Sequence, residues 1–117
     1  MNIEIKNAII TGTILGKEDH GIFSTVYLYL DYGSSGQGFC GYSLNTPNGE
    51  EDTHIGTAWG MEFILRIMDV LEVTSWEKLP GTHCRVKAEH SKVHAIGHIL
   101  KNKWFDPKVD LSFLLDK

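Results

Sequence analysis

Hydrophobic residues recur at helical spacing along one stretch near the middle of the chain, from Gly56 to Val73. One apolar line follows the i, i+3, i+4, i+7 pattern of a helix face, and a second line lies beside it. The first line is Met61, Ile64, Leu65, Met68 and Leu71, and the second is Phe63, Ile67 and Val70. Only Glu62, Arg66 and Asp69 form a polar stripe, which is narrow for a surface helix. We therefore expect a central helix over Thr57–Val73, covered on two sides by its own sheet and by a second layer or another subunit.

Segments rich in β-branched and aromatic residues predict about five strands around this helix. They are Ile3–Leu15, Ile22–Asp31, Gln37–Leu44, Thr82–Ala88 and Val93–Leu100. Turn residues separate the first three, so we expect an antiparallel meander. Asn45–Ile55 contains Pro, Gly and an acidic run and is expected to be an exposed loop. Trp76–Leu79 is predicted to form a single helical turn.

A short closing helix is predicted near the end of the chain, because Asp106 is a suitable N-cap and Pro107 suits the first helical position. The predicted fold is a single α+β domain over residues 1–117. An antiparallel sheet of about five strands packs on one central buried helix, and a short C-terminal helix follows.

Composition narrows the classes of partner. The chain has 117 residues, 42% of them hydrophobic, and a net charge of −4 with no cluster of Lys and Arg. Polymeric nucleic acid requires a concentrated positive surface, so we do not expect it as a partner. Met1–Asn7 lacks the apolar core of a signal peptide, and no run is long enough to cross a membrane. We expect a cytoplasmic protein without membrane contact, whose Cys40 and Cys84 are reduced thiols.

The start of the predicted helix is the first candidate site. Gly56 and Thr57 precede it and Gly60 lies in its first turn, which leaves backbone N–H groups and a hydroxyl at the positive end of the helix dipole. Such an end binds phosphate or carboxylate. The alternative is structural: Thr57 as an ordinary N-cap, and Gly60 as the point where a strand packs closely.

Histidines and potential nucleophiles make a weaker case. His90, His94 and His98 are spaced by four in a predicted hairpin, where one metal ion cannot span them at about 3.3 Å per residue. His83 and Cys84 are neighbours on a strand and point to opposite faces, so they form no catalytic dyad. We expect no metal, no cofactor and no enzymatic activity.

Cations and aromatic residues gather in the second half of the chain. Arg85, Lys87 and Lys92 lie on or near one predicted hairpin, and Trp104 follows it. Cations beside an aromatic face suit a nucleotide, with charge for the phosphates and stacking for the base. The alternative is a solvated basic edge beside a core tryptophan.

Several segments taken together resemble a widespread family of small proteins encoded by phages and prophages. They are Glu18–Ile22, Leu30–Gly33, Gly36–Phe39, Gly56–Gly60, Ser75–Gly81, Ile96–His98 and Lys103–Pro107, in matching order over nearly the whole chain. The pattern is similar to that of the Thoeris anti-defence sponge proteins of the first described type. The resemblance implies a homo-oligomer that holds an immune signalling nucleotide between subunits, either glycocyclic ADP-ribose or a cyclic trinucleotide, without cleaving it.

The resemblance also implies roles for individual residues. Phosphates would meet Arg85, Lys92 and the helix start at Thr57, whereas His83, Trp59 or Trp104 would stack a base. His54 stands where the family has a basic residue, and Cys40 stands where a glycine is usual. His83 and the polar turn around His90 replace an aromatic residue and an amide of the family pattern. The predicted ligand-binding residues are therefore His54, Thr57, Trp59, His83, Arg85, His90, Lys92 and Trp104.

Two other readings remain open at the level of sequence. One is an inhibitor that binds a host defence enzyme, in the manner of an anti-CRISPR protein, through the acidic residues Glu50, Glu51 and Asp52. The other is a phage accessory protein without a ligand.

Overall fold

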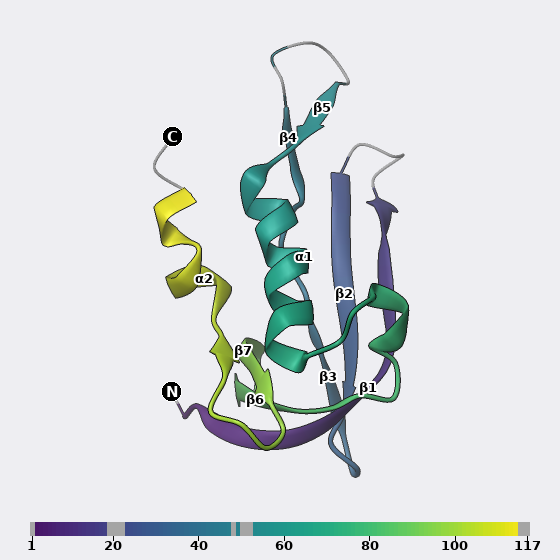
Figure 1. Ribbon diagram of the computed structural model, residues 1–117, viewed down its shortest axis with the longest axis vertical. Helices are drawn as coiled ribbons and strands as arrows, with labels where there is room; N and C mark the ends of the chain where they lie inside the picture. Colours follow the sequence, from purple (N-terminus) through teal and green to yellow (C-terminus); the bar gives the residue numbers. More distant parts are fainter. Residues whose placement is uncertain (1, 19–22, 48, 50–52, 115–117) are drawn as a thin grey trace.

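The computed structural model describes residues 2–18, 23–47, 49 and 53–114, and it has the predicted α+β fold (Figure 1). The strands are β1 (Glu4–Glu18), β2 (Phe23–Asp31), β3 (Gly36–Phe39), β4 (Asn45–Pro47), β5 (His54–Gly56), β6 (His83–Glu89), β7 (Lys92–His98) and β8 (Trp104–Phe105). The helices are α1 (Ala58–Leu71) and α2 (Pro107–Asp110), with 3₁₀ turns η1 (Trp76–Lys78) and η2 (Ser112–Leu114). Of the helices described, none has the length and apolar character needed to span a bilayer.

Six strands form one antiparallel sheet in the order β3-β2-β1-β6-β7-β8. The central strand β1 pairs with β6 through Glu4–Ile9 and with β2 through Ile9–Glu18, and its register shifts between Ile10 and Gly12. A bulge of this kind bends the strand and increases its twist. Figure 1 shows β1 curving beneath the lower end of the molecule. The sheet is therefore coiled, and its two halves meet along a single strand.

The coiling brings β3, at one edge of the sheet, to the turn between β6 and β7. The side-chain amide of Gln37 donates hydrogen bonds of 3.0 Å to the backbone carbonyls of Glu89 and His90. The hydroxyl of Tyr32 donates to Oε1 of the same Gln37. One glutamine thus joins segments more than 50 residues apart in the chain.

Helix α1 covers the inner face of this sheet. Its Phe63 and Ile67 are fully buried, and they pack into one core with residues of β1, β2, β3 and β6, among them Ile10, Leu28, Phe39 and Val86. The second apolar line of the helix therefore faces the sheet. In the first line, Met61 and Leu65 are 56% and 41% exposed. The predicted packing of the helix on its own sheet is confirmed, and cover of the other side by another subunit stays a prediction.

The start of α1 is fixed by a close approach to the segment before β4. Thr57 is the N-cap as predicted, and its Oγ1 accepts the N–H of Gly60 at 2.8 Å. The N–H of Thr57 donates to the carbonyl of Leu44 at 3.1 Å. A Cβ atom on Gly60 would lie 2.6 Å from that carbonyl oxygen, so glycine is required for this contact. Gly60 is thus a point of close packing, as the structural alternative predicts, but its neighbour is the segment before β4 and not a strand.

Several boundaries differ from those predicted. The main sheet has six strands rather than about five, because the two-residue strand β8 is added beside β7. The first strand continues through Gly16 to Glu18, and the third ends at Phe39. The segment predicted as an exposed loop holds β4 and β5, which pair only with each other and form a ribbon beyond the start of α1 (Figure 1). The predicted hairpin β6–β7, the turn η1, and the Asp106 cap with Pro107 at the start of α2 are confirmed.

Candidate functional site

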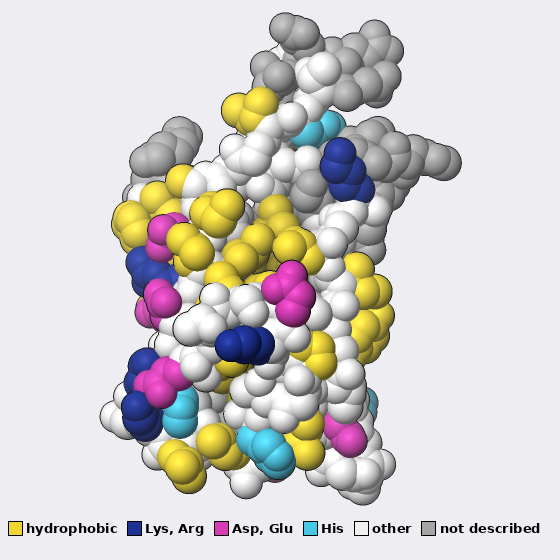
Figure 2. All heavy atoms as spheres, turned by 45° about the vertical axis from the view of Figure 1, so that its right-hand side comes forward, with side chains coloured by type: hydrophobic (Ala, Val, Ile, Leu, Met, Phe, Trp, Pro, Cys, Tyr) yellow, Lys and Arg dark blue, Asp and Glu magenta, His cyan; other side chains and the backbone are white. Residues whose placement is uncertain are grey.

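A groove of about 460 Å³ lies at the start of α1. It is lined by Leu15, Gly16, Lys17, Leu44, Asn45, His54, Gly56, Thr57, Gly60, Met61 and Ile64. The apolar lining comes from the helix and from β1, and Lys17 and His54 add polar groups from β1 and β5. Figure 2 shows hydrophobic side chains gathered in the upper half of this face, below the β4–β5 ribbon. A concave, largely apolar surface with a few converging polar groups is the usual form of a small-molecule site.

The backbone at this end of the groove favours anions. Thr57 holds the N–H of Gly60, and Met61 N–H bonds the Thr57 carbonyl at 3.1 Å. The first N–H groups of an α-helix have no acceptor within the helix, and the helix dipole places partial positive charge there. Together with the ammonium group of Lys17 at the groove wall, they offer a negative group several donors.

A second hollow of about 300 Å³ adjoins the groove and shares Thr57 with it. Gly41, Tyr42, Ser43 and Trp59 complete its lining. The rings of Tyr42 and Trp59 have their centroids 5.5 Å apart, and Trp59 stacks on Phe63 at 5.5 Å with an interplanar angle of 11°. Burial raises the pKa of the Tyr42 hydroxyl, and the nearby Asp106 carboxylate adds to the effect. Tyr42 therefore stays neutral at physiological pH.

Two polar features of this aromatic hollow bear on ligand binding. The ammonium nitrogen of Lys92 lies over the Tyr42 ring, 5.2 Å from its centroid, so the start of β7 places a cation next to one ring of the hollow without lining it. The indole N–H of Trp59 is buried and has no acceptor among the residues that the structure describes. A buried donor without an acceptor is unfavourable, by about 1–3 kcal/mol, and a ligand oxygen would relieve this.

Arg85 and Trp104 lie together at a different place, on the outer face of the sheet. They point away from the face that holds Cys84 and Val86, because neighbouring side chains on a strand alternate. The Arg85 guanidinium carbon lies 4.9 Å from the Trp104 ring centroid, and the Lys87 ammonium lies 4.5 Å from it. Arg85 also donates through Nε to the His98 carbonyl and through Nη2 to the Lys101 carbonyl, both at 2.8 Å. This arginine holds the β7–β8 loop.

The predicted binding residues thus fall into two groups. His54, Thr57 and Trp59 line the two hollows at the start of α1, and Lys92 lies over the Tyr42 ring of the second hollow. Arg85 and Trp104 pair on the outer sheet face. His83 is exposed at the start of β6 on that same face, and His90 is exposed in the β6–β7 turn. A single chain does not bring all eight residues to one site.

Sequence reasoning missed Lys17 and Tyr42. Lys17 lies beyond Leu15, the predicted end of the first strand, and only the continuation of β1 to Glu18 places it at the groove wall. Tyr42 follows Gly41, whose φ of 96° redirects the chain after β3. Its contact with Lys92 joins residues 50 positions apart, which no local pattern indicates.

Other candidate chemistry finds little support in the described part of the chain. Its His, Cys, Asp and Glu residues form no group of three or more that is able to hold a metal ion. Cys84 is buried, and desolvation raises the pKa of its thiol to about 12, which leaves it protonated and unreactive. Cys40 and Cys84 are both free of disulfides. The acidic run Glu50–Asp52 lies outside the described residues.

Comparison with known proteins adds no relative. No protein-family model, curated protein or solved structure matches this chain.

Proposed function

We propose that the protein binds a small signalling nucleotide, glycocyclic ADP-ribose or a cyclic trinucleotide, and holds it without cleaving it, as an anti-defence sponge encoded by a phage. The observation that carries the proposal is the pair of adjoining hollows at the start of α1. One hollow supplies a helix end and a lysine, and the other supplies an aromatic pair with a cation above it.

The two hollows suit the two halves of a nucleotide. Phosphate oxygens would accept hydrogen bonds from the first-turn N–H groups of α1 and would meet the ammonium group of Lys17. A base or ribose would lie against Tyr42 and Trp59, where the buried indole N–H would donate to one of its oxygen or nitrogen atoms. Lys92 would add charge next to the aromatic rings.

Non-catalytic binding fits the side chains around these hollows. Their lining includes backbone groups, a hydroxyl used as a helix cap, aromatic rings, Lys17 and one histidine, His54. These groups orient and neutralise a ligand. Hydrolysis of a phosphate ester by general acid–base catalysis would use a positioned pair of titratable groups or a metal ion instead.

We further propose that a second copy of the chain closes the groove. Leu15 and Met61 at its wall are 48% and 56% exposed, and Leu65, one turn further along α1, is 41% exposed. These apolar side chains would be buried if a partner lay along this side of the helix. Light scattering on the purified protein should then give the mass of an oligomer, and Leu65→Lys should lower that mass.

The direct test measures ligand capture. The purified protein is incubated with glycocyclic ADP-ribose or with a panel of cyclic trinucleotides, unbound ligand is removed by filtration, and the protein is heated. Chromatography should recover one of these compounds intact. Recovery of no ligand, or of a cleaved ligand, would overturn the proposal. In the first case a protein target would be sought by affinity capture with purified host defence enzymes, and in the second a turnover assay would follow.

Matched variants locate the site. Lys17→Met keeps the aliphatic stem and removes the charge, and it should weaken affinity by about 10–100-fold, the range for a hydrogen bond to a charged group. Trp59→Phe keeps a ring and removes the N–H, and a loss of about 2–10-fold is expected. Lys108→Met on α2 is the control, since this exposed lysine lines neither hollow. Equal affinities for the Lys17 and Lys108 variants would place the ligand elsewhere.

A further inference from the structure

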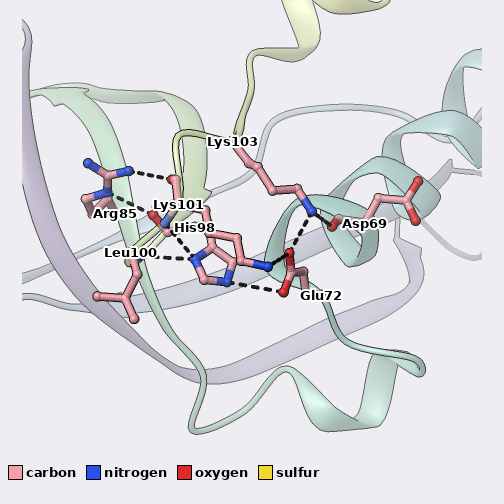
Figure 3. A network of polar contacts seen from close by, with 7 residues as sticks. All are labelled: Asp69, Glu72, Arg85, His98, Leu100, Lys101 and Lys103. Atoms are coloured by element: carbon pink, nitrogen blue, oxygen red, sulfur yellow. Dashed lines mark hydrogen bonds and ion pairs between the residues drawn. The ribbon is translucent and has the colours of Figure 1, made fainter.

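His98, the last residue of β7, organises the turn that follows it (Figure 3). Its Nδ1 accepts hydrogen bonds from the backbone N–H groups of Leu100 at 3.0 Å and Lys101 at 3.1 Å. An imidazole nitrogen that accepts hydrogen bonds carries no proton, so this ring is neutral with its hydrogen on Nε2. Nε2 lies 3.6 Å from Oε1 of Glu72 at the C-terminal end of α1. The ring therefore lies between the turn and the helix.

Glu72 attaches the same turn to α1 (Figure 3). Its Oε2 receives the ammonium groups of Lys101 at 2.7 Å and Lys103 at 3.0 Å, and Lys103 also donates to the Asp69 carbonyl at 3.1 Å. Hydrogen bonds from the two lysines lower the pKa of the Glu72 carboxyl to about 2. The carboxylate thus remains charged over the whole range in which histidines titrate.

The charged and titratable groups facing His98 come from three elements. Glu72 belongs to the end of α1, Lys101 and Lys103 belong to the β7–β8 loop, and Arg85 on β6 donates to the His98 and Lys101 carbonyls. Cys84 lies opposite His98 in the β6–β7 register and stays neutral, because burial raises the pKa of its thiol to about 12. Two lysines therefore meet one carboxylate and Arg85 holds the backbone of the same turn, so the closed turn already contains more cations than carboxylates.

We propose that His98 is a proton-sensitive latch, which holds the β7–β8 loop on α1 while its imidazole is neutral and releases the loop when Nδ1 takes up a proton from solvent. A protonated Nδ1 is a donor facing two backbone donors, so both hydrogen bonds of the turn are lost. Nε2 of the imidazolium still faces Oε1 of Glu72, while Lys101 and Lys103 hold Oε2, so the lost hydrogen bonds are those to the backbone of the turn. Release of the β7–β8 loop would break the hydrogen bond from Arg85 to the Lys101 carbonyl, which holds the loop in the closed turn.

The direction of the pH effect follows from which form stabilises the closed turn. Only the neutral imidazole accepts the two N–H groups, so the closed turn is favoured above the histidine titration range. It is lost as the pH falls and Nδ1 takes up a proton. Nothing in this latch depends on the proposed nucleotide site, so each proposal stands or fails by its own test.

The test follows the protein by NMR from pH 8 to pH 5. Imidazole ¹⁵N shifts report whether Nδ1 of His98 is bare or protonated, and amide–water exchange, corrected for its intrinsic pH dependence, reports the turn. We expect protection of the Leu100 and Lys101 amides to fall by about tenfold or more as His98 protonates, while amides within α1 keep theirs. An unchanged turn around a protonated His98 would overturn the proposal.

Two variants make the assignment specific. In His98→Asn the amide oxygen replaces Nδ1 as acceptor in an Asx-type turn and does not titrate, so Leu100 and Lys101 should stay protected down to pH 5. In His83→Asn, which changes an exposed histidine on β6, the turn should still open as in the native protein. If the turn opened at the same pH in His98→Asn, another group would be the sensor and the proposal would be refuted.

Discussion

Replacing Gly60 with alanine tests how the start of α1, and with it the candidate site, is held in place. A Cβ atom at this position would lie 2.6 Å from the carbonyl oxygen of Leu44 and 2.7 Å from its Cα. The carbonyl oxygen also accepts hydrogen bonds from the amide and the hydroxyl of Thr57, at 3.1 and 3.3 Å. The contact atoms are backbone and cannot rotate away. Either α1 or the segment before β4 must therefore shift.

The change in the free energy of unfolding caused by Gly60→Ala is the sum of opposing effects. Alanine inside a helix is more favourable than glycine by about 0.5–1 kcal/mol. Overpacking costs about 1–3 kcal/mol, and weakening the Thr57–Leu44 hydrogen bonds adds about 1 kcal/mol. The expected net loss in the free energy of unfolding is about 1–3 kcal/mol. With an m-value of about 1.5 kcal/mol/M, the midpoint of urea unfolding should fall by roughly 0.7–2 M.

Urea unfolding followed by circular dichroism measures this loss, and Gly56→Ala provides the control. A Cβ atom at Gly56 meets no atom within 4 Å, so its substitution should change stability by less than about 0.5 kcal/mol. If Gly60→Ala proved as stable as the native protein, the close approach of α1 to Leu44 would not exist as described. The same result would remove the basis for the geometry of the groove.

Three further predictions concern the aromatic core, the Glu72 carboxylate and the two thiols. Phe63 is fully buried among four aromatic rings, so Phe63→Ala should lower the free energy of unfolding by about 3–5 kcal/mol and reduce the near-ultraviolet circular dichroism. The pKa of Glu72 is lowered from 4.5 to about 2, so its ion pairs stabilise the fold above pH 4.5 and this stabilisation is lost as the pH falls toward 2. The urea midpoint of Glu72→Gln should lack that part of the acid dependence. A thiol reagent at pH 8 should modify Cys40 in the native protein and spare Cys84, whose pKa is about 12; equal reaction at both would contradict the burial of Cys84.

Features of the fold that depend only on residues close together in the sequence could be predicted from it. The Thr57 cap, the Asp106 cap and the alternation of buried residues in β6 follow from short-range chemistry, and all three are present. The rotation of α1 does not follow from it, since the helix carries two apolar lines of similar strength. In the structure the second apolar line faces the sheet. The close contact between Gly60 and Leu44 holds the start of α1 in that rotation.

The candidate site was predictable only in part, for the same reason. The helix start was evident from Thr57 and the glycines around it. Lys92 lies above Tyr42 because the sheet is coiled and Gln37 holds the β6–β7 turn against β3, and no local sequence pattern indicates this contact. Strand β8 has two residues, too few for any periodicity to be seen.

The strand order also has a consequence for how the chain is made. The long strand β1 is synthesised well before its partner β6, which begins only at His83. At about 5–20 residues per second, the edge of β1 that pairs with β6 remains open for roughly 4–15 s of synthesis, the time needed to reach His83 from Ile9. That half of β1 carries Ile5 and Ile9, which remain 59% and 37% exposed even in the folded chain. Until β6 is made, the nascent chain therefore has an unpaired strand edge with apolar side chains, the kind of edge that pairs with other chains.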